Sequence, residues 1–330
     1  MDGREWGVMK AVVMREFGPP DVLRLEDAPG PSAGAADVVI SVEFASVTFV
    51  ETQVRAGRPP SPAMWPALPA ILGNGVGGTV IRAGAQAGPG LLGRQVVIAL
   101  GGRGGYAEQA AAAARGLIEV PDGLRLRDAT ALLADGRTAL GLTELAGVGR
   151  GDTVLVEAAA GGVGTLLVQL TRNAGARVVA VARGERKLAA VRDLGADLAI
   201  DYGDGDWPAR VREAAGPVDV VFDGVGGSIG LAAFGLLGSG GRFCPFGMAS
   251  GEFTPADAGL ARERDITVLR NGPPDPLRLR TLSEAALGVA AAGRIRPVIG
   301  QEFALPQAAA AHAAIESRAT IGKTLLAVTR

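Results

Sequence analysis

The stretch Thr153–Gln169 reads TVLVEAAAGGVGTLLVQ, and it decides the fold of this chain. A strand of buried type leads into a glycine-rich turn, and a helical pattern begins directly after the turn. The spacing is A-x-x-G-x-x-G, with Ala158 where a dinucleotide-binding turn has its first glycine. Gly161 lets the backbone approach a pyrophosphate, Gly164 lets the helix pack closely on the strand, and the helix N-terminus favours phosphates. The predicted cofactor-binding residues of the turn are Ala160, Gly161, Gly162, Val163 and Gly164. The alternative is a tight strand–helix turn that binds nothing, and the second strand that follows argues against it.

Strands and helices alternate along the chain beyond this turn. Arg177–Ala182 (RVVAVA), Asp219–Phe222 (DVVF) and Gly241–Phe246 (GRFCPF) have the composition of buried strands, and helical patterns lie between them, among them Ile229–Leu237. Helical spacing also predicts a helix at Asp128–Gly147, before the glycine-rich turn. Such alternation with short joints predicts a doubly wound parallel sheet, the Rossmann fold. The first third differs, because strand-like runs such as Asp37–Phe44 (DVVISVEF) are joined by Gly- and Pro-rich segments, which indicates a small β-barrel domain.

The end of the second Rossmann strand predicts which dinucleotide binds. An NAD-binding fold has an acidic residue about 20 residues beyond the glycine turn, on the ribose 2′-hydroxyl. This chain has Arg183 there, and Lys187 follows one helical turn later. A cation at this place suits a 2′-phosphate, so we expect NADPH to be the cofactor. In the alternative, both side chains are solvated surface cations, and the neighbouring Glu185 is compatible with either interpretation.

The composition excludes several classes of site. The 330 residues include one cysteine, Cys244, and one histidine, His312, so neither an internal disulfide nor a Cys/His zinc site can form. We expect no metal, a scaffold or surface role for His312, and a buried, unreactive Cys244. The net charge of −1 gives no support for binding to nucleic acid or to an anionic membrane. Met1–Val8 is polar and lacks the apolar region of a signal peptide, so we expect a cytoplasmic protein.

Four motifs together resemble a known family. They are the AAAGGVG turn followed by Gln169, the run Gly104–Glu108 (GGYAE), the run Leu194–Asp197 (LGAD) with Ile200–Tyr202 (IDY), and Glu316–Thr320 (ESRAT). The chain resembles the quinone oxidoreductase (zeta-crystallin-like) branch of the medium-chain dehydrogenase/reductase superfamily over residues 9–330. The resemblance implies an α/β protein with a GroES-like β-barrel domain at 1–127 and 272–330 and a Rossmann domain at 128–271. It also implies a zinc-free enzyme, often a homodimer, that transfers hydride from NADPH to a quinone or an activated alkene.

The resemblance also assigns residues to the cofactor. Lys187 and Tyr202 match family residues that hold the adenosine ribose phosphate, and Arg318 matches a further contact on the phosphate side. Thr138 matches the threonine that faces the nicotinamide carboxamide. The remaining matches are in loops close to the cofactor: Gly224, Val225, Phe246, Gly247 and Met248. The alternatives are ordinary packing for Tyr202, a helix-start cap for Thr138 and a core position for Phe246.

The departures from the family concern the substrate side. The segment that matches the family's pocket loop has Thr48 for the usual Asn and Glu51 for the usual Asp. Gln53 and Pro59 replace tyrosines that are often present in the family. The two tyrosines of the chain, Tyr106 and Tyr202, lie outside this loop, so the loop contains no tyrosine that could donate a proton. Asp135 and Arg137 stand just before Thr138, where they either face the nicotinamide or pair with each other in the scaffold, and Glu157 replaces what is often a histidine. The candidate donors to a substrate oxyanion are Thr48, Gln53 and Arg137.

These observations lead to one main functional expectation and two alternatives. The main one is an NADPH-dependent reductase of a quinone or an α,β-unsaturated carbonyl compound, with the final proton taken from water. The unusual pocket loop also allows a biosynthetic reductase or reductive cyclase that acts on a conjugated intermediate. The second alternative is a protein that binds NADPH without catalysis. It is motivated by the absence of the usual tyrosines and asparagine from the loop.

Overall fold

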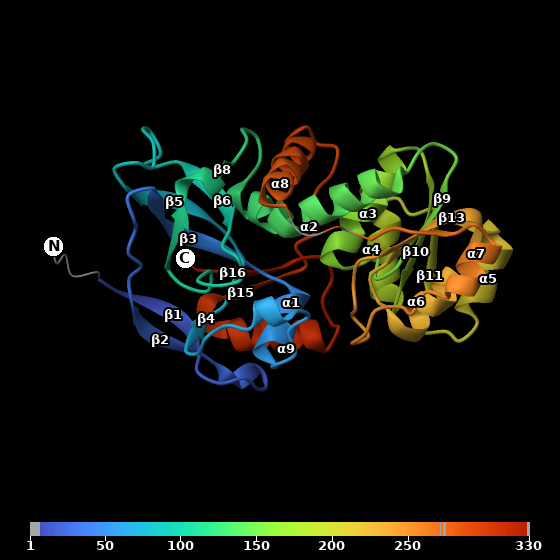
Figure 1. Cartoon of the computed structure of the whole chain (residues 1–330), viewed down its shortest axis with the longest axis horizontal. Coiled ribbons are helices and arrows are strands. Elements are labelled where there is room, and N and C mark those ends of the chain that lie inside the picture. The colour runs from blue at the N-terminus through green and yellow to red at the C-terminus, as the bar shows by residue number, and fades with distance from the viewer. Residues whose placement is uncertain (1–6, 271, 273–274, 329–330) are drawn as a thin grey trace. The chain divides into compact units, whose positions relative to one another are not determined.

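The computed structural model describes residues 7–270, 272 and 275–328, and most of the polar start at Met1–Val8 lies outside the described residues. The chain forms two compact units (Figure 1). Unit 1 comprises Met1–Ala134 with Ile299–Arg330, and unit 2 comprises Asp135–Val298. Helix α2 (Leu126–Ala146) begins in unit 1 and ends in unit 2. The expected division at 127/128 and 271/272 differs from these bounds, because helix α8 (Pro276–Ala291) belongs to unit 2, where Arg278 pairs with Glu144 of α2 at 2.6 Å.

Unit 1 consists mainly of antiparallel sheets. The smaller sheet has the order β2 (Leu23–Pro29), β1 (Val8–Met14), β4 (Ala70–Ile71). The larger one has the order β15 (Gln301–Ala304), β16 (Thr324–Ala327), β3 (Asp37–Val47), β5 (Gly75–Ala83), β6 (Gln95–Ala99), β8 (Ile118–Glu119), and β7 (Gln109–Ala113) also pairs with β3. Because β16 pairs antiparallel with β3, the C-terminal segment completes the sheet that the first third of the chain begins, as the resemblance to a GroES-like domain implies.

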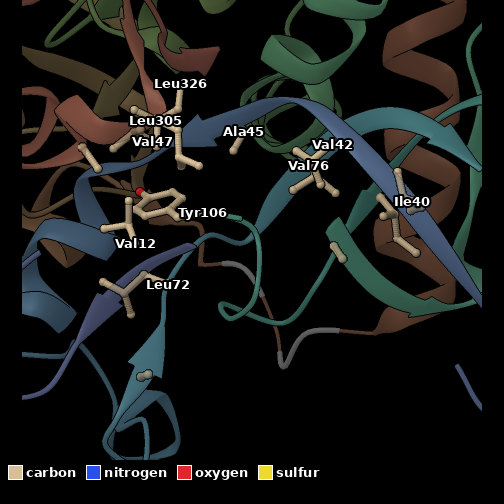
Figure 2. Close-up of a cluster of buried hydrophobic side chains, with 14 of the residues drawn as sticks. Val12, Ile40, Val42, Ala45, Val47, Leu72, Val76, Tyr106, Leu305 and Leu326 are labelled. Carbon is tan, nitrogen blue, oxygen red and sulfur yellow. The ribbon is translucent and has the colours of Figure 1, made fainter. Parts of the chain in front are cut away.

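The core of unit 1 lies between these strands and two short helices, α1 (Phe49–Arg55) and α9 (Ala308–Glu316). Strand β3 contributes Ile40, Val42, Ala45 and Val47, which are buried together with residues of β5, β16 and the loop that carries Tyr106 (Figure 2). The ring of Tyr106 belongs to the same cluster and lies beside Val12 and Val47 (Figure 2). The barrel therefore has a buried tyrosine, whose hydroxyl needs a polar partner inside the core.

Unit 2 is a doubly wound parallel sheet, as predicted. Its strand order is β11 (Leu198–Asp201), β10 (Arg177–Ala182), β9 (Thr153–Val156), β12 (Val218–Asp223), β13 (Leu237–Pro245), β14 (Thr267–Val268). The helices of the alternating units are α3 (Gly162–Asn173), α4 (Glu185–Asp193), α5 (Trp207–Ala215), α6 (Gly227–Phe234) and α7 (Ala258–Glu263). The strand order reverses between β9 and β12, and ligands of such sheets bind outside the carboxyl ends of the strands at this point.

Two features of the described residues bear on function. None of the helices there combines the length and apolar character that crossing a bilayer requires. Within the same residues, no three His, Cys, Asp or Glu side chains gather in a way that would hold a metal ion.

Candidate functional site

The glycine turn links β9 to α3 and leaves room for a ligand only because specific side chains are missing. Ala158 adopts φ 45°, the left-handed conformation that glycine usually supplies at the first position of such a turn. A Cβ on Gly164 would lie 2.4 Å from the carbonyl oxygen of Ala158 and 2.7 Å from the Cα of Ala159. Gly161 is the N-cap of α3 and has no side chain with which to cap it. The first turn of α3 therefore presents backbone N–H groups that can donate hydrogen bonds to an anion.

Asp135 of α2 lies against the same turn. A Cβ on Gly162 would be 2.0 Å from Oδ2 of Asp135, so glycine at this position makes room for the carboxylate. Arg137 is half-buried in α2, and burial lowers the pKa of its guanidinium, an effect that the charge of Asp135 opposes. Thr138 lies within α2 rather than at its start, so the helix-start cap considered for it is excluded. Its hydroxyl is not needed for capping.

The residues expected to bind a 2′-phosphate gather at the ends of β10 and β11. The guanidinium carbon of Arg183 lies 5.8 Å from the centre of the Tyr202 ring, while Arg183 remains exposed to solvent. Asp201 fixes both loops, because its carboxylate accepts hydrogen bonds of 2.7 Å from the backbone N–H groups of Gly184 and Gly203. Gly184 is the N-cap of α4 and has φ 86°, a conformation that favours glycine.

Two further groups complete the charge balance there. Glu185 forms an ion pair with Arg192 on the surface of α4, so Glu185 does not neutralise Arg183. Lys187 lies half-buried in the first turn of α4. Arg318, the third expected phosphate contact, is exposed at the end of α9 in unit 1 and has φ 58°.

The loops after β12 and β13 pack directly on each other. The backbone N–H groups of Phe246 and Gly247 both donate to the carbonyl oxygen of Asp223, at 2.9 Å and 3.1 Å. A Cβ on Gly224 would lie 2.8 Å from Cζ of Phe246, so the ring lies against the glycine backbone. Val225 is buried, and its carbonyl oxygen accepts from Ser250 at 2.8 Å. The structure thus brings together four of the expected nicotinamide-side residues, and Met248 follows them half-buried in the same loop.

Glu157 and Asp223, at the carboxyl ends of β9 and β12, are both fully buried. Asp223 accepts hydrogen bonds from the N–H groups of Val225 at 3.1 Å and Gly226 at 2.7 Å, and from the hydroxyl of Thr254 at 2.6 Å. Burial raises the pKa of the Glu157 carboxyl well above its ordinary value, and the charge of Asp223 raises it further. The sequence showed Glu157 only as a departure from the family, and nothing in its spacing indicated a partner 66 residues away.

The segment expected to line the substrate pocket is a helix, α1, with a capping box at its start. The side chain of Thr48 accepts from the N–H of Glu51 at 3.4 Å, and the N–H of Thr48 donates to Glu51 Oε2 at 2.6 Å. The Thr48 hydroxyl also donates to Glu51 Oε2, at 3.0 Å. Gln53 is buried and donates to the Thr52 hydroxyl at 3.2 Å. Two of the three proposed oxyanion donors are therefore already engaged within α1.

A polar cluster inside unit 1 surrounds the chain's single histidine. Nε2 of His312 lies 3.0 Å from the hydroxyl of Tyr106, and both residues are fully buried. Burial lowers the pKa of His312 to about 3, helped by the charge of Arg55, so the imidazole is neutral at pH 7. Burial, the charge of Glu51 and a hydrogen bond with Glu51 together hold the Tyr106 pKa well above its usual range. Arg55 itself is buried and forms an ion pair with Glu316. His312 thus belongs to the scaffold of unit 1.

The single cysteine is inert in this fold. Cys244 is fully buried in β13, and burial raises the pKa of its thiol to about 12. At neutral pH the group is a thiol, which is a poor nucleophile.

Comparisons with known proteins agree with this architecture. Residues 34–122 match the family model described as the alcohol dehydrogenase GroES-like domain, and residues 162–279 match that of the zinc-binding dehydrogenases. A quinone oxidoreductase of Pseudomonas aeruginosa is 30% identical to this chain, over 96% of this chain and 99% of the relative. A 2-haloacrylate reductase of a Burkholderia species is 31% identical over 97% of this chain and 98% of the relative.

Solved structures give the same result. The quinone oxidoreductase of Escherichia coli, complexed with NADPH, has a TM-score of 0.87 at 26% identity and covers 97% of this chain and 100% of its own. A mycobacterial protein, also complexed with NADPH, has a TM-score of 0.85 at 32% identity, with the same coverage. The two-unit fold, the glycine turn at the sheet's switch point and these similarities agree: the chain belongs to the quinone oxidoreductase branch of the medium-chain dehydrogenase/reductase superfamily and is an oxidoreductase.

Proposed function

We propose that this protein transfers a hydride from NADPH to a quinone or to an α,β-unsaturated carbonyl compound. Support comes from the relatives, which include quinone oxidoreductases and a 2-haloacrylate reductase, and from two similar structures that hold NADPH. A 2-haloacrylate is an activated alkene, so the two kinds of relative have a common requirement: an acceptor carbon conjugated to a carbonyl group.

The observation that carries the choice of NADPH is the position of Arg183 against the ring of Tyr202. A guanidinium at the end of the second Rossmann strand provides several N–H donors to a 2′-phosphate, where NAD-binding folds have a carboxylate for the ribose hydroxyl. Asp201 is nearby, but both of its oxygens accept backbone N–H groups, and those bonds hold the Arg183–Gly184 turn in place. Lys187 adds a second cation in the same turn.

The residues of unit 2 fit a bound dinucleotide. Side chains at the glycine positions would fill the space at Gly161–Gly164, and the backbone N–H groups of the first turn of α3 suit a pyrophosphate. The packed loops around Gly224 and Phe246 would hold the nicotinamide, with Val225, Gly247 and Met248 beside it and Thr138 toward the carboxamide. Arg318 is proposed as a further phosphate contact, on the ground of the family resemblance. The protein is proposed to work as a homodimer.

When bound, NADPH supplies the hydride. The chain's own residues orient the acceptor, exclude water and stabilise the oxyanion that forms on the substrate's carbonyl group. Among the proposed donors, Arg137 carries the charge that suits this role best, because Thr48 and Gln53 already donate within α1. A proton from water then completes the reduced product, since the pocket segment contains no tyrosine.

The test is the oxidation of NADPH by the purified protein with a panel of acceptors: 1,4-quinones, enones, enoyl thioesters and a 2-haloacrylate. We expect turnover with at least one class and a product that has gained two hydrogens. If NADPH binds but no acceptor is reduced, the proposed activity is wrong. The role of Arg137 as oxyanion donor is tested with Arg137→Ala. Arg137→Lys is the matched control, because lysine keeps the positive charge and loses the guanidinium geometry.

A non-catalytic NADPH-binding role is the second candidate. It is favoured by the engagement of Thr48 with Glu51 and by the burial of Gln53, which together leave the α1 segment with few free polar groups for a substrate. It predicts tight NADPH binding without turnover. A biosynthetic reductase would instead reduce conjugated intermediates and use simple quinones poorly.

A further inference from the structure

Glu157 and Asp223 form a buried carboxyl pair that is short of hydrogen-bond donors. One N–H group, that of Val225, lies 3.3 Å from Glu157 Oε2 and 3.1 Å from Asp223 Oδ1, so the two side chains converge on the same donor. The strands bring them together, because Val156 and Phe222 are paired in the sheet and the N–H of Glu157 donates to the carbonyl of Phe222 at 3.0 Å. Neither side chain is accessible to solvent.

The donors around the pair are distributed unequally. Asp223 receives the N–H groups of Val225 and Gly226 and the hydroxyl of Thr254, whereas Glu157 receives only the longer branch of the Val225 bond. Oε1 of Glu157 is buried and has no hydrogen-bond partner among the described residues. Two carboxylates in such a place would leave one negative charge without compensation, which is far more costly than keeping one group neutral.

We infer that Glu157 and Asp223 share one proton at neutral pH, held on Glu157, and that this pair with a single negative charge positions the loops that the cofactor requires. Glu157 in its acid form donates to Asp223, and Asp223 is the acceptor of the pair because two backbone N–H groups and the Thr254 hydroxyl already donate to its oxygens.

The surroundings of Glu157 support this assignment of the proton. Desolvation is the largest cause that raises its pKa, followed by the charge of Asp223 and the hydrogen bond between the two carboxyl groups, and the Val225 N–H opposes them. From α6, Gly230 packs against Asp223, since a Cβ there would be 2.7 Å from Asp223 Oδ2 and 1.9 Å from the Thr254 hydroxyl. The charge that raises the pKa of Glu157 is thus that of Asp223 from β12. Thr254 and Gly230 of α6 pack against the Asp223 carboxylate.

The pair connects to both cofactor loops through Asp223. The carboxylate of Asp223 accepts hydrogen bonds from the N–H groups of Val225 and Gly226. The backbone carbonyl oxygen of Asp223 accepts those from Phe246 and Gly247. If Glu157 loses its proton, repulsion between the carboxylates acts at the residue on which both loops depend. Glu157 is therefore a positioning residue, and its effect on NADPH rests on the function proposed above.

The first test uses the ligand-free protein and so does not depend on NADPH. Because the folded state holds a proton on Glu157 that the unfolded chain releases above pH 4.5, this proton makes wild-type stability fall as pH rises. Glu157→Gln donates to Asp223 without titrating. We expect the ratio of the unfolding constants, wild type over Glu157→Gln, to rise with pH above about pH 5 by up to about tenfold per pH unit, until Glu157 ionises in the folded protein. Equal pH dependence in the two proteins would overturn the inference.

A second measurement does not depend on whether Glu157→Gln folds. The infrared carbonyl stretch of a protonated carboxyl group should persist at neutral pH in the wild type, and Asp223→Asn should shift it, because its hydrogen-bond partner has changed. If no such band is present at neutral pH, the pair is doubly ionised and the inference is wrong.

The consequence for the cofactor is tested separately. NADPH affinity of the wild type should weaken with rising pH more steeply than that of Glu157→Gln. If the stability ratio behaves as expected but NADPH affinity does not, the shared proton stands and its role in positioning the loops is contradicted. If neither protein binds NADPH at any pH, the proposed function fails while the stability result still decides the shared proton.

Discussion

Arg183 and Tyr202, which are 19 residues apart in the sequence, meet with the guanidinium carbon 5.8 Å from the centre of the aromatic ring. They are brought together because β10 and β11 are parallel neighbours, with Ala182 paired to Asp201, so the residue after each strand emerges at the same edge of the sheet. The ring limits the positions that the exposed Arg183 side chain can adopt, which would favour the phosphate contact proposed for it.

The closeness of Gly164 to the chain before it predicts that this turn tolerates no added side chain. In Gly164→Ala the new Cβ would meet the Ala158 carbonyl oxygen at 2.4 Å, and backbone atoms cannot move aside cheaply. We expect a loss of about 1–3 kcal/mol in the free energy of unfolding, measured by urea denaturation, together with weaker NADPH binding. Gly288→Ala is the matched control, because Gly288 also lies within a helix and no atom beyond the adjacent backbone of that helix comes within 4 Å of its Cβ position. It should gain about 0.5–1 kcal/mol. Equal effects of the two changes would contradict the steric argument.

The neutral His312 predicts an acid-sensitive component of stability. Its folded pKa of about 3 lies below the ordinary value of 6.5, so the unfolded chain binds a proton that the folded protein does not. Stability from this group is complete above pH 6.5 and is lost as pH falls toward the folded pKa, by up to about 1.4 kcal/mol per pH unit. His312→Gln should remove the part of the pH dependence of stability that comes from the imidazole. The carboxyl groups should titrate equally in both proteins. Parallel stability curves for the two proteins between about pH 4 and about pH 6.5 would show that His312 is protonated inside the fold.

The ion pair between α1 and α9 predicts a large effect of removing one partner. Arg55 is 1% exposed, and its guanidinium donates to Glu316 and to the carbonyl oxygen of Gly18. Glu316→Ala leaves a buried charge without its counterion, which should cost about 3 kcal/mol in chemical denaturation. The control is Glu284→Ala, which removes an exposed partner of Arg280 and should cost less than about 1 kcal/mol. Similar costs at the two sites would mean that the Arg55 charge is not desolvated.

The Rossmann unit was the part of the fold that the sequence predicted best. The predicted strand at Arg177–Ala182 has the same bounds as β10, and the helix predicted at Asp128–Gly147 is α2 with a shift of one or two residues. The reason is that a parallel strand is buried on both faces, so its apolar run is continuous and easy to recognise. The helix predicted at Ile229–Leu237 instead spans Gly227–Phe234, because Leu237 opens β13 and an apolar residue suits either element.

The buried polar groups were beyond sequence reasoning for a physical reason. Tyr106 and His312 are 206 residues apart and meet only after the C-terminal strands join the barrel. Glu157 and Asp223 meet through strand pairing that no local pattern indicates. The capping box of Thr48 and Glu51, in contrast, has a local signature, S/T-x-x-E, which would have predicted α1 had the segment been considered apart from the family's pocket loop.

The most direct test of the central claim is a titration of the purified protein with NADPH and with NADH, followed by calorimetry. We expect NADPH to bind at least about tenfold more tightly, and Arg183→Ala to remove most of this preference, since one charged hydrogen bond contributes about 1.5–3 kcal/mol. Arg186→Ala, which removes a neighbouring exposed arginine of α4, should leave the preference intact. Equal affinity for the two cofactors, or a preference that survives Arg183→Ala, would contradict the assignment of the phosphate site.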